Sequence, residues 1–415
     1  MSLDIRPTLS ALLRNRTGAV LVATQVAIAL AVLVNAAYII MQRIEKIHRP
    51  TGIDEQNILV IESAGFTDRF HQTASVEEDL RYLRGVSGVV AATASNSIPL
   101  SNGGNSDSLV TRPDAPRPGY INDMEIDEQG LDTLGVKLVA GRNFRHDEVQ
   151  PPLTRTDASH FVPVIIVSRE LGEYLFPGQN PLGKQVWSAF NHAATIVGVV
   201  DPIMGTFPGS DHPDRMFFLP RLPDEFIVCR YWVRTRPGQL DTVARLVESH
   251  LARSNPDRVI DFVRPLTYFK NRSYLGDSSM EIFLLTVTAL VIAVTSLGVF
   301  ALATFNVSTR TKQIGTRRAV GARRGDIVRY FMVENGLITG AGILTGCALA
   351  FAAGYWLSVQ YALPRLDLYY LVGGVLALWG IGQLAAWQPA RRAAAVPPSV
   401  ATRTVCDEPG AVSGC

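Results

Sequence analysis

Four long stretches of the chain are almost free of charged side chains. They cover residues 18–41, 282–305, 333–357 and 368–387, and Glu334 is the one exception. A helix that spans a bilayer needs about 20 predominantly apolar residues. We therefore predict an α-helical membrane protein with four transmembrane helices, at residues 18–41, 281–306, 332–357 and 368–388. The first stretch exceeds the apolar part of a cleaved signal peptide, so we expect it to remain as a span.

Residues 42–280 read as a large folded domain between the first and second spans. Short runs that alternate between apolar and polar residues predict strands, for example at 57–63 and 195–200. Helices are predicted at 75–84, where Ser75 and Glu78 form a capping-box pattern, and at 239–253. This mixture predicts an α+β domain. Helical patterns also continue from the first span to Pro50, and from Leu266 into the second span, which predicts a pair of stalk helices.

Basic side chains gather in three segments next to the predicted spans, and these segments determine the expected orientation. They lie in the N-terminus, residues 1–17, in a loop at residues 307–331, and in the tail, residues 389–415. Because Lys and Arg are enriched on the cytoplasmic side, we expect all three there. The short loop 358–367 and the domain 42–280 are then periplasmic, in a cell inner membrane. The net charge of +2 predicts no nucleic-acid partner.

The loop carries seven of these basic side chains: Arg310, Lys312, Arg317, Arg318, Arg323, Arg324 and Arg329. Gly321 is expected to end one short helix, because glycine adopts the left-handed conformation that terminates helices. A second helix should start near Gly325 and run on into the third span. The loop is thus predicted to be a small helix on the cytoplasmic face, shaped for docking by a partner.

Residues 178–184 spell G-x-x-x-x-G-K but do not predict a phosphate-binding loop. Gln185 stands where Ser or Thr would hold magnesium, and a strand rather than a helix is expected to follow. The seven histidines are scattered, with no pair spaced as zinc ligands, and no nucleophile motif occurs. We therefore expect no enzyme activity, metal or cofactor on this chain.

Two features inside the third span need an interpretation. Glu334 could be a functional ionisable group, but we favour a place at the cytoplasmic interface, within reach of headgroups and of Arg329 or Tyr330. Four glycines form two pairs spaced four apart, which lets helices approach closely. These predicted packing residues, with a partner helix in this chain or another, are Gly336, Gly340, Gly342 and Gly346.

Several motifs together resemble the FtsX-like, MacB-type ABC transporter permeases. The usual form of their signature is close to R-E-I-G-[ILV]-R-[RK]-A-[LV]-G-A-x-x-x-D-I, from which Gln313 and Thr316 depart here. Residues 130–144, 167–186 and 195–200 resemble a MacB-like periplasmic core domain, and residues 388–403 resemble the close of the family. Nearly the whole chain is covered. The G-x-x-x-x-G-K pattern is then a turn of that family.

The resemblance implies a division of labour between several chains. Two permease chains, identical or different, pair in the lipid membrane, and a separate ABC ATPase subunit, with its ATP and Mg²⁺, docks on the loop. No cytoplasmic region of this sequence is expected to hold the ATPase. A periplasmic adaptor and an outer-membrane channel are further implied partners. The residues that match the signature, with Arg318, are the candidates for coupling to the ATPase: Ile314, Gly315, Arg317, Arg318, Ala319, Val320, Gly321, Ala322, Asp326 and Ile327.

Three functions are compatible with that resemblance. The leading expectation is export or efflux of a small hydrophobic or peptide substrate. Related permeases release lipoproteins, which is a second transport function. The third is a non-transporting role in mechanotransmission or signalling, as a regulator of a cell-wall hydrolase or as an antibiotic sensor.

Overall fold

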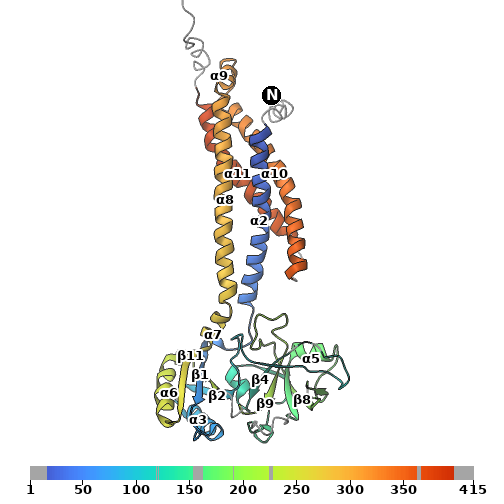
Figure 1. The fold of residues 1–415 in the computed structure, drawn as a ribbon, viewed down its shortest axis with the longest axis vertical. Coiled ribbons are helices and arrows are strands. Elements are labelled where there is room, and N and C mark those ends of the chain that lie inside the picture. The colour runs from blue at the N-terminus through green and yellow to red at the C-terminus, as the bar shows by residue number, and fades with distance from the viewer. Residues whose placement is uncertain are drawn as a thin grey trace, which may run out of the picture. The chain divides into compact units, whose positions relative to one another are not determined.

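The computed structural model describes residues 16–117, 119, 121–152, 162–189, 191–223, 228–361 and 366–396. The chain divides into two compact units (Figure 1). One, which we call the membrane unit, joins residues 1–48 to residues 277–415. The other, the exported unit, comprises residues 49–276.

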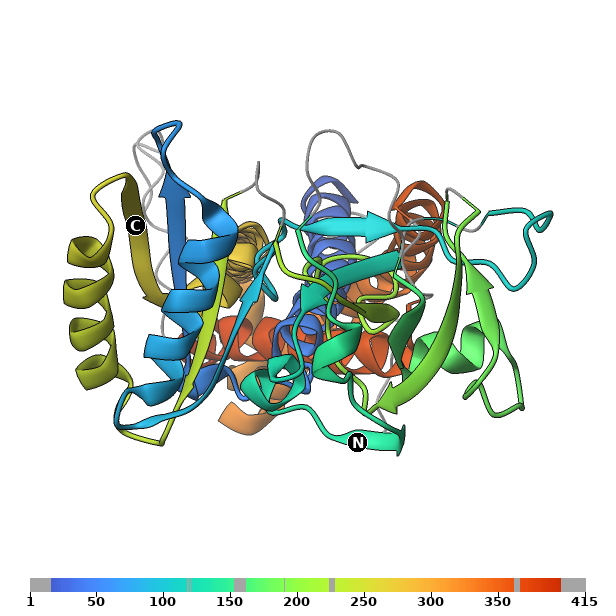
Figure 2. The ribbon, with the colours of Figure 1, turned by 90° about the horizontal axis from the view of Figure 1, so that it is seen from below.

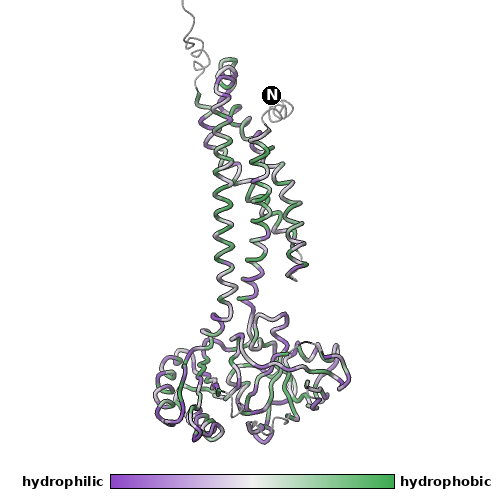
Figure 3. Tube along the Cα trace, viewed as in Figure 1, coloured by the Kyte–Doolittle hydropathy of each residue, from purple (hydrophilic) through white to green (hydrophobic). Residues whose placement is uncertain are grey.

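The membrane unit is built from helices. They are α2 (Arg16–His48), α8 (Leu275–Thr309), α9 (Thr311–Ala319), α10 (Arg324–Tyr361) and α11 (Leu368–Ala394). All but α9 are long and apolar enough to cross a membrane, and Figure 3 shows their apolar stretches in green. The four predicted spans are confirmed, although each helix extends beyond its apolar run.

Three of these helices share a buried core. Val26 and Leu30 of α2 pack with Ile343 and Ala350 of α10 and with Leu378 of α11. Helix α8 takes a smaller part in this core, through Val299, and most of its large apolar side chains are exposed. Exposed apolar side chains on a spanning helix are suited to lipid or to another membrane helix.

Two helix ends test the predicted stalks. Helix α2 ends at His48, as the following Pro50 predicts. The other prediction, an unbroken helix from Leu266 into the second span, is wrong. Helix α7 (Leu266–Ser273) ends at Tyr274, whose φ of −97° and ψ of 7° leave the helical range. Tyr274, the residue at this break, is buried, with 3% of its surface exposed.

The exported unit contains two sheets. The first is antiparallel, in the order β11-β1-β10-β2, with β1 (Ile58–Gly65), β2 (Val89–Ser95), β10 (Cys229–Thr235) and β11 (Arg258–Pro265). Helices α3 (Gln72–Gly85) and α6 (Leu240–Ser254) cover one face of it, as Figure 2 shows. Their apolar side chains, such as Leu83 and Val247, are fully buried against the sheet.

The second sheet has seven strands and mixed directions. Its order is β3-β4-β9-β6-β8-β5, and β7 also pairs with β8. The strands β4 and β9 run parallel, as do β6 and β8, and the other pairs are antiparallel. The bounds are β3 (Asn105–Asp107), β4 (Ile121–Ile126), β5 (Leu138–Gly141), β6 (Val164–Ser168), β7 (Gln185–Trp187), β8 (Ala193–Val200) and β9 (Met216–Pro220).

Short elements complete this unit, which confirms the α+β prediction. They are α4 (Gly130–Leu134), α5 (Arg169–Leu175), η1 (Glu55–Asn57) and η2 (His146–Glu148). An apolar core that includes Trp232 of the first sheet and Phe218 of the second joins the two sheets. The capping box predicted at Ser75 is wrong, because α3 begins one turn earlier, at Gln72. The Ser75 hydroxyl instead accepts a hydrogen bond from Asn255 Nδ2 at 3.2 Å.

Candidate coupling site in the membrane unit

The short helix α9 lies between α8 and α10 in the chain, and its end and the start of α10 form as predicted. Arg310 alone separates α8 from α9. After α9 ends at Ala319, Gly321 takes a φ of +102°, a conformation that glycine adopts without strain. Helix α10 begins at Arg324, and Asp326 Oδ2 accepts a hydrogen bond from the Arg323 amide at 3.0 Å. The carboxylate thus satisfies one of the free N–H groups at this helix start.

The predicted coupling residues divide into a buried and an exposed set. Ile314, Gly315 and Ile327 are buried, and the two isoleucines pack in one cluster with Phe331 of α10 and Ala393 of α11. The exposed set is Arg317, Ala319, Val320, Gly321 and Asp326, whereas Arg318 and Ala322 are half-buried. Val320 is 84% exposed. The buried set therefore fixes α9 on the membrane unit. The exposed set lies on the second half of α9, in the turn that follows it and at the start of α10, and we call this surface the α9 tip.

Polar contacts add to this attachment. The Arg310 guanidinium donates to Glu334 Oε2 at 3.0 Å and to the Tyr330 hydroxyl at 3.3 Å. The Arg317 guanidinium lies over the Tyr330 ring, 4.8 Å from its centre. Arg318 donates to the backbone oxygen of Val396, after the end of α11. Three of the basic side chains thus hold α9 in position, besides any effect on membrane orientation.

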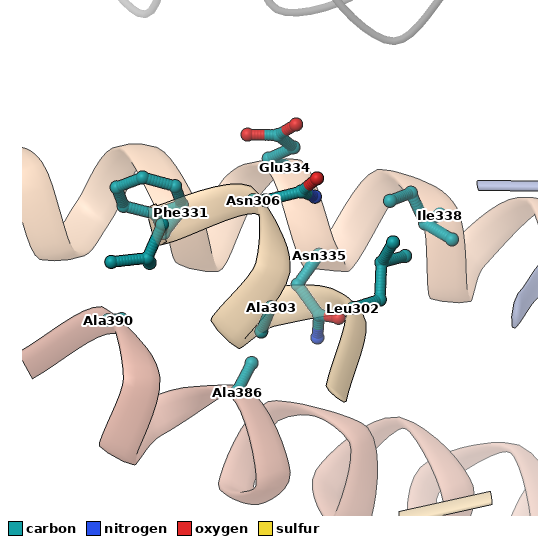
Figure 4. Close-up of a pocket in the computed structure, with 10 residues that line it drawn as sticks. Leu302, Ala303, Asn306, Phe331, Glu334, Asn335, Ile338, Ala386 and Ala390 are labelled. Carbon is teal, nitrogen blue, oxygen red and sulfur yellow. The ribbon is translucent and has the colours of Figure 1, made fainter. Parts of the chain in front are cut away.

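Glu334 corrects the interpretation that the sequence favoured. Its side chain is 2% exposed and pairs with Arg310, rather than reaching headgroups, Arg329 or Tyr330. The reason is that this turn of α10 faces α8 and α11. Glu334 and Asn335 line a small pocket between α8, α10 and α11 (Figure 4). The sequence could have indicated this pocket through three polar residues that lie in predominantly apolar helices, Asn306, Glu334 and Asn335.

The pocket holds about 20 Å³ of space, which is enough for one water molecule. Asn335 Nδ2 donates to the Gly382 carbonyl of α11 at 3.1 Å. Glu334 Oε1 is buried and has no hydrogen-bond partner within the described part of the chain. The remaining lining is apolar, and the whole set is Leu302, Ala303, Asn306, Val307, Phe331, Glu334, Asn335, Ile338, Ala386 and Ala390.

The four glycines of α10 do not lie in equivalent surroundings. A Cβ atom added at Gly342 would lie 2.6 Å from the Ala23 carbonyl oxygen of α2, and one at Gly346 would lie 3.0 Å from Ala27 Cα. At Gly336 it would lie 3.2 Å from Gln383 Nε2 of α11, and at Gly340 no other described residue comes within 4 Å. Only the pair Gly342 and Gly346 therefore brings α10 close to the α2 backbone.

The exported unit has its own polar groups. Burial raises the pKa of Asp123 on β4 to about 7, Asp107 adds to the rise, and Arg221 opposes it. In the turn that spells G-x-x-x-x-G-K, Lys184 contacts the Phe176 ring and the Gln179 side chain. Among the described residues, no three or more His, Cys, Asp or Glu side chains are grouped as a metal site would need.

Two family models match this chain. The MacB-like periplasmic core domain matches residues 20–250, which is more than half of the chain, and the FtsX-like permease C-terminal domain matches residues 285–398. The chain belongs to this permease family. It is a multi-pass membrane protein of the ABC transporter permease type, with a MacB-like periplasmic core domain between its first two membrane helices.

Named relatives are similar over part of their length. The macrolide export ATP-binding/permease protein MacB of Neisseria gonorrhoeae is 25% identical over 281 residues, which are 66% of this chain and 42% of that protein. MacB 1 of Yersinia pestis is 27% identical over 256 residues, 60% of this chain and 39% of that protein. The chain thus spans less than half the length of these relatives. The solved periplasmic region of MacB from Actinobacillus actinomycetemcomitans aligns with a TM-score of 0.34 and 20% identity, over 55% of this chain and 96% of that one.

Proposed function

We propose that this chain is a permease subunit that couples ATP hydrolysis by a separate ABC ATPase to movement of the exported unit, and so drives export of a small hydrophobic or peptide substrate. The ATPase docks on the α9 tip. A second permease chain, a periplasmic adaptor and an outer-membrane channel complete the assembly. The names of the relatives refer to macrolide export, and a macrolide falls within this substrate class.

The observation that carries the proposal is the contrast between the two sides of α9. Its underside is fixed by Ile314 in an apolar cluster and by the ion pair of Arg310 with Glu334. Its tip leaves Val320 84% exposed, flanked by basic side chains. A rigidly held surface with an exposed apolar residue at its centre is suited to binding a partner, because the core of a protein interface is apolar and less charged than its rim.

The proposed orientation places α9 and both termini in the cytoplasm and the exported unit in the periplasm. Lys and Arg residues lie in α9, at the start of α10 and at the end of α11. Such residues are enriched on the cytoplasmic side of spanning helices. An ATPase works where ATP is present, so this orientation and the docking surface support each other. We place the protein in the cell inner membrane.

The experiment introduces one negative charge at each of two exposed positions of α9. Val320→Glu lies in the α9 tip, whereas Gln313→Glu, the matched control, supplies the residue that is usual in the resembling family. The full chain is tagged in its native host, and the bound proteins are identified by mass. We expect an ABC ATPase with the wild type and with Gln313→Glu, and a loss of at least tenfold with Val320→Glu. Undiminished ATPase binding by Val320→Glu would overturn the docking proposal.

A further inference from the structure

The ion pair between Arg310 and Glu334 lies where three helices meet. Arg310 is the single residue between the end of α8 and the start of α9. Glu334 belongs to α10 and lies one turn after Tyr330 and Phe331. The two side chains are 24 positions apart in the sequence and 3.0 Å apart in space. Movement of α9 can therefore reach α8 through residue 310, and this pair is a polar contact with α10 beside the apolar cluster that contains Ile314.

The pair is well shielded from solvent. The Glu334 side chain is 2% exposed and that of Arg310 is 17% exposed. The attraction between the two charges is stronger than it would be in water, because the surroundings screen them less. The Tyr330 hydroxyl also accepts from Arg310, at 3.3 Å, and its ring lies under Arg317. The side chains that connect α9 to α10 thus form one continuous contact.

The pair is also incompletely satisfied. Glu334 Oε2 accepts from Arg310, whereas Oε1 has no hydrogen-bond partner in the described residues, and the carboxylate borders the pocket of about 20 Å³. Asn306, one turn before Arg310 on α8, lines the same pocket (Figure 4). An unpaired buried polar atom is costly in a low-dielectric site, so a shift of the carboxylate that gave Oε1 a partner would be favourable.

We propose that Arg310 and Glu334 are positioning residues of the coupling reaction. Their ion pair transmits to α10 the movement of α9 that the ATPase causes, whereas movement passes into α8 through the backbone at residue 310. This inference rests on the proposed docking of an ATPase on α9. It goes beyond docking, because both residues lie behind the surface that the ATPase would touch. Removing the pair should therefore leave binding and hydrolysis intact and stop the response of the permease.

The test uses the double variant Arg310→Met with Glu334→Leu. Replacing both members of a buried pair by apolar side chains of similar size is often neutral or stabilising, so the variant should fold. The matched control is Arg329→Gln, which removes an exposed charge from the same segment of α10. Each full chain is purified with its co-purifying ATPase. Hydrogen–deuterium exchange of residues 350–360, near the far end of α10, is measured with and without a non-hydrolysable ATP analogue.

We expect the ATP analogue to change the exchange of residues 350–360 in the wild type and in Arg329→Gln. In the double variant this change should be at least fivefold smaller, while the bound ATPase still hydrolyses ATP. A wild-type ATP response in a stable double variant would overturn the proposal, since the pair would then only stabilise the fold. If the double variant is unstable, the near-isosteric Glu334→Gln replaces it and is judged by the same two outcomes.

The two proposals fail in different ways. Absence of an ATPase from the wild-type complex would overturn the proposed function and this inference with it. An ATPase that binds and drives the same ATP response with and without the pair would overturn this inference alone.

Discussion

The close contact of α10 with α2 predicts a large difference between two glycines only two positions apart. A Cβ atom at Gly342 would lie 2.6 Å from the Ala23 carbonyl oxygen and 2.8 Å from Val26 Cβ, which is closer than real Cβ contacts come. The oxygen belongs to a helix backbone and cannot rotate away. Gly342→Ala must therefore push the helices apart, and overpacking of this kind costs about 1–3 kcal/mol.

Gly340→Ala is the matched control, because nothing lies within 4 Å of its added Cβ atom. It makes the same chemical change in the same helix, and alanine favours a helix over glycine by about 1 kcal/mol. Unfolding of the full chain in mixed detergent micelles, followed by tryptophan fluorescence, measures both. We expect Gly342→Ala to lower the free energy of unfolding and Gly340→Ala to leave it equal or higher. Equal effects of the two substitutions would refute the packing of α10 on α2.

Two further predictions concern the exported unit. Because the pKa of Asp123 in the folded chain is about 7, above its unfolded value of 3.8, the folded state holds the extra proton between these values, and stability falls as pH rises through them. Asp123→Asn should abolish that part of the slope in denaturant unfolding measured from pH 4 to pH 8; an unchanged slope would contradict it. Asp79 accepts from Arg258 Nη2 at 2.9 Å and both side chains are buried, so Asp79→Ala should cost about 3–5 kcal/mol in thermal or denaturant unfolding. The control Arg69→Ala, from an exposed pair, should cost about 0–1 kcal/mol, and equal costs would contradict the reasoning.

The spanning helices and the C-terminal end of α9 could be predicted from sequence because their signals are local. Apolar length alone identifies a span, and Gly321 ends its helix through its own backbone freedom. The strand β1 and the helix α6 were predicted for the same reason. The break at Tyr274 was missed because the local sequence, KNRSYLGDS, contains no proline and reads as a continuous helix.

The remaining site depends on contacts between helices, which a single sequence does not specify. Whether Glu334 faces lipid or protein is decided by the rotation of α10 against α8 and α11, so Arg310 was not foreseen as its partner. The glycine pattern indicated close packing correctly for Gly342 and Gly346, whereas Gly340 meets open space in this chain. In the exported unit, the parallel pairing of β4 with β9 joins segments about ninety residues apart and left no local signal.

Photo-crosslinking from the α9 tip tests the central claim most directly. A photoreactive amino acid is placed at Val320, which is 84% exposed, and at Leu344, which is 76% exposed on the apolar part of α10, in the full chain in its native membrane. The account predicts that Val320 cross-links to an ABC ATPase, identified by mass, and that Leu344 does not. Cross-linking of the ATPase from Leu344 and not from Val320, or from neither position, would contradict the claim that this helix is the docking surface.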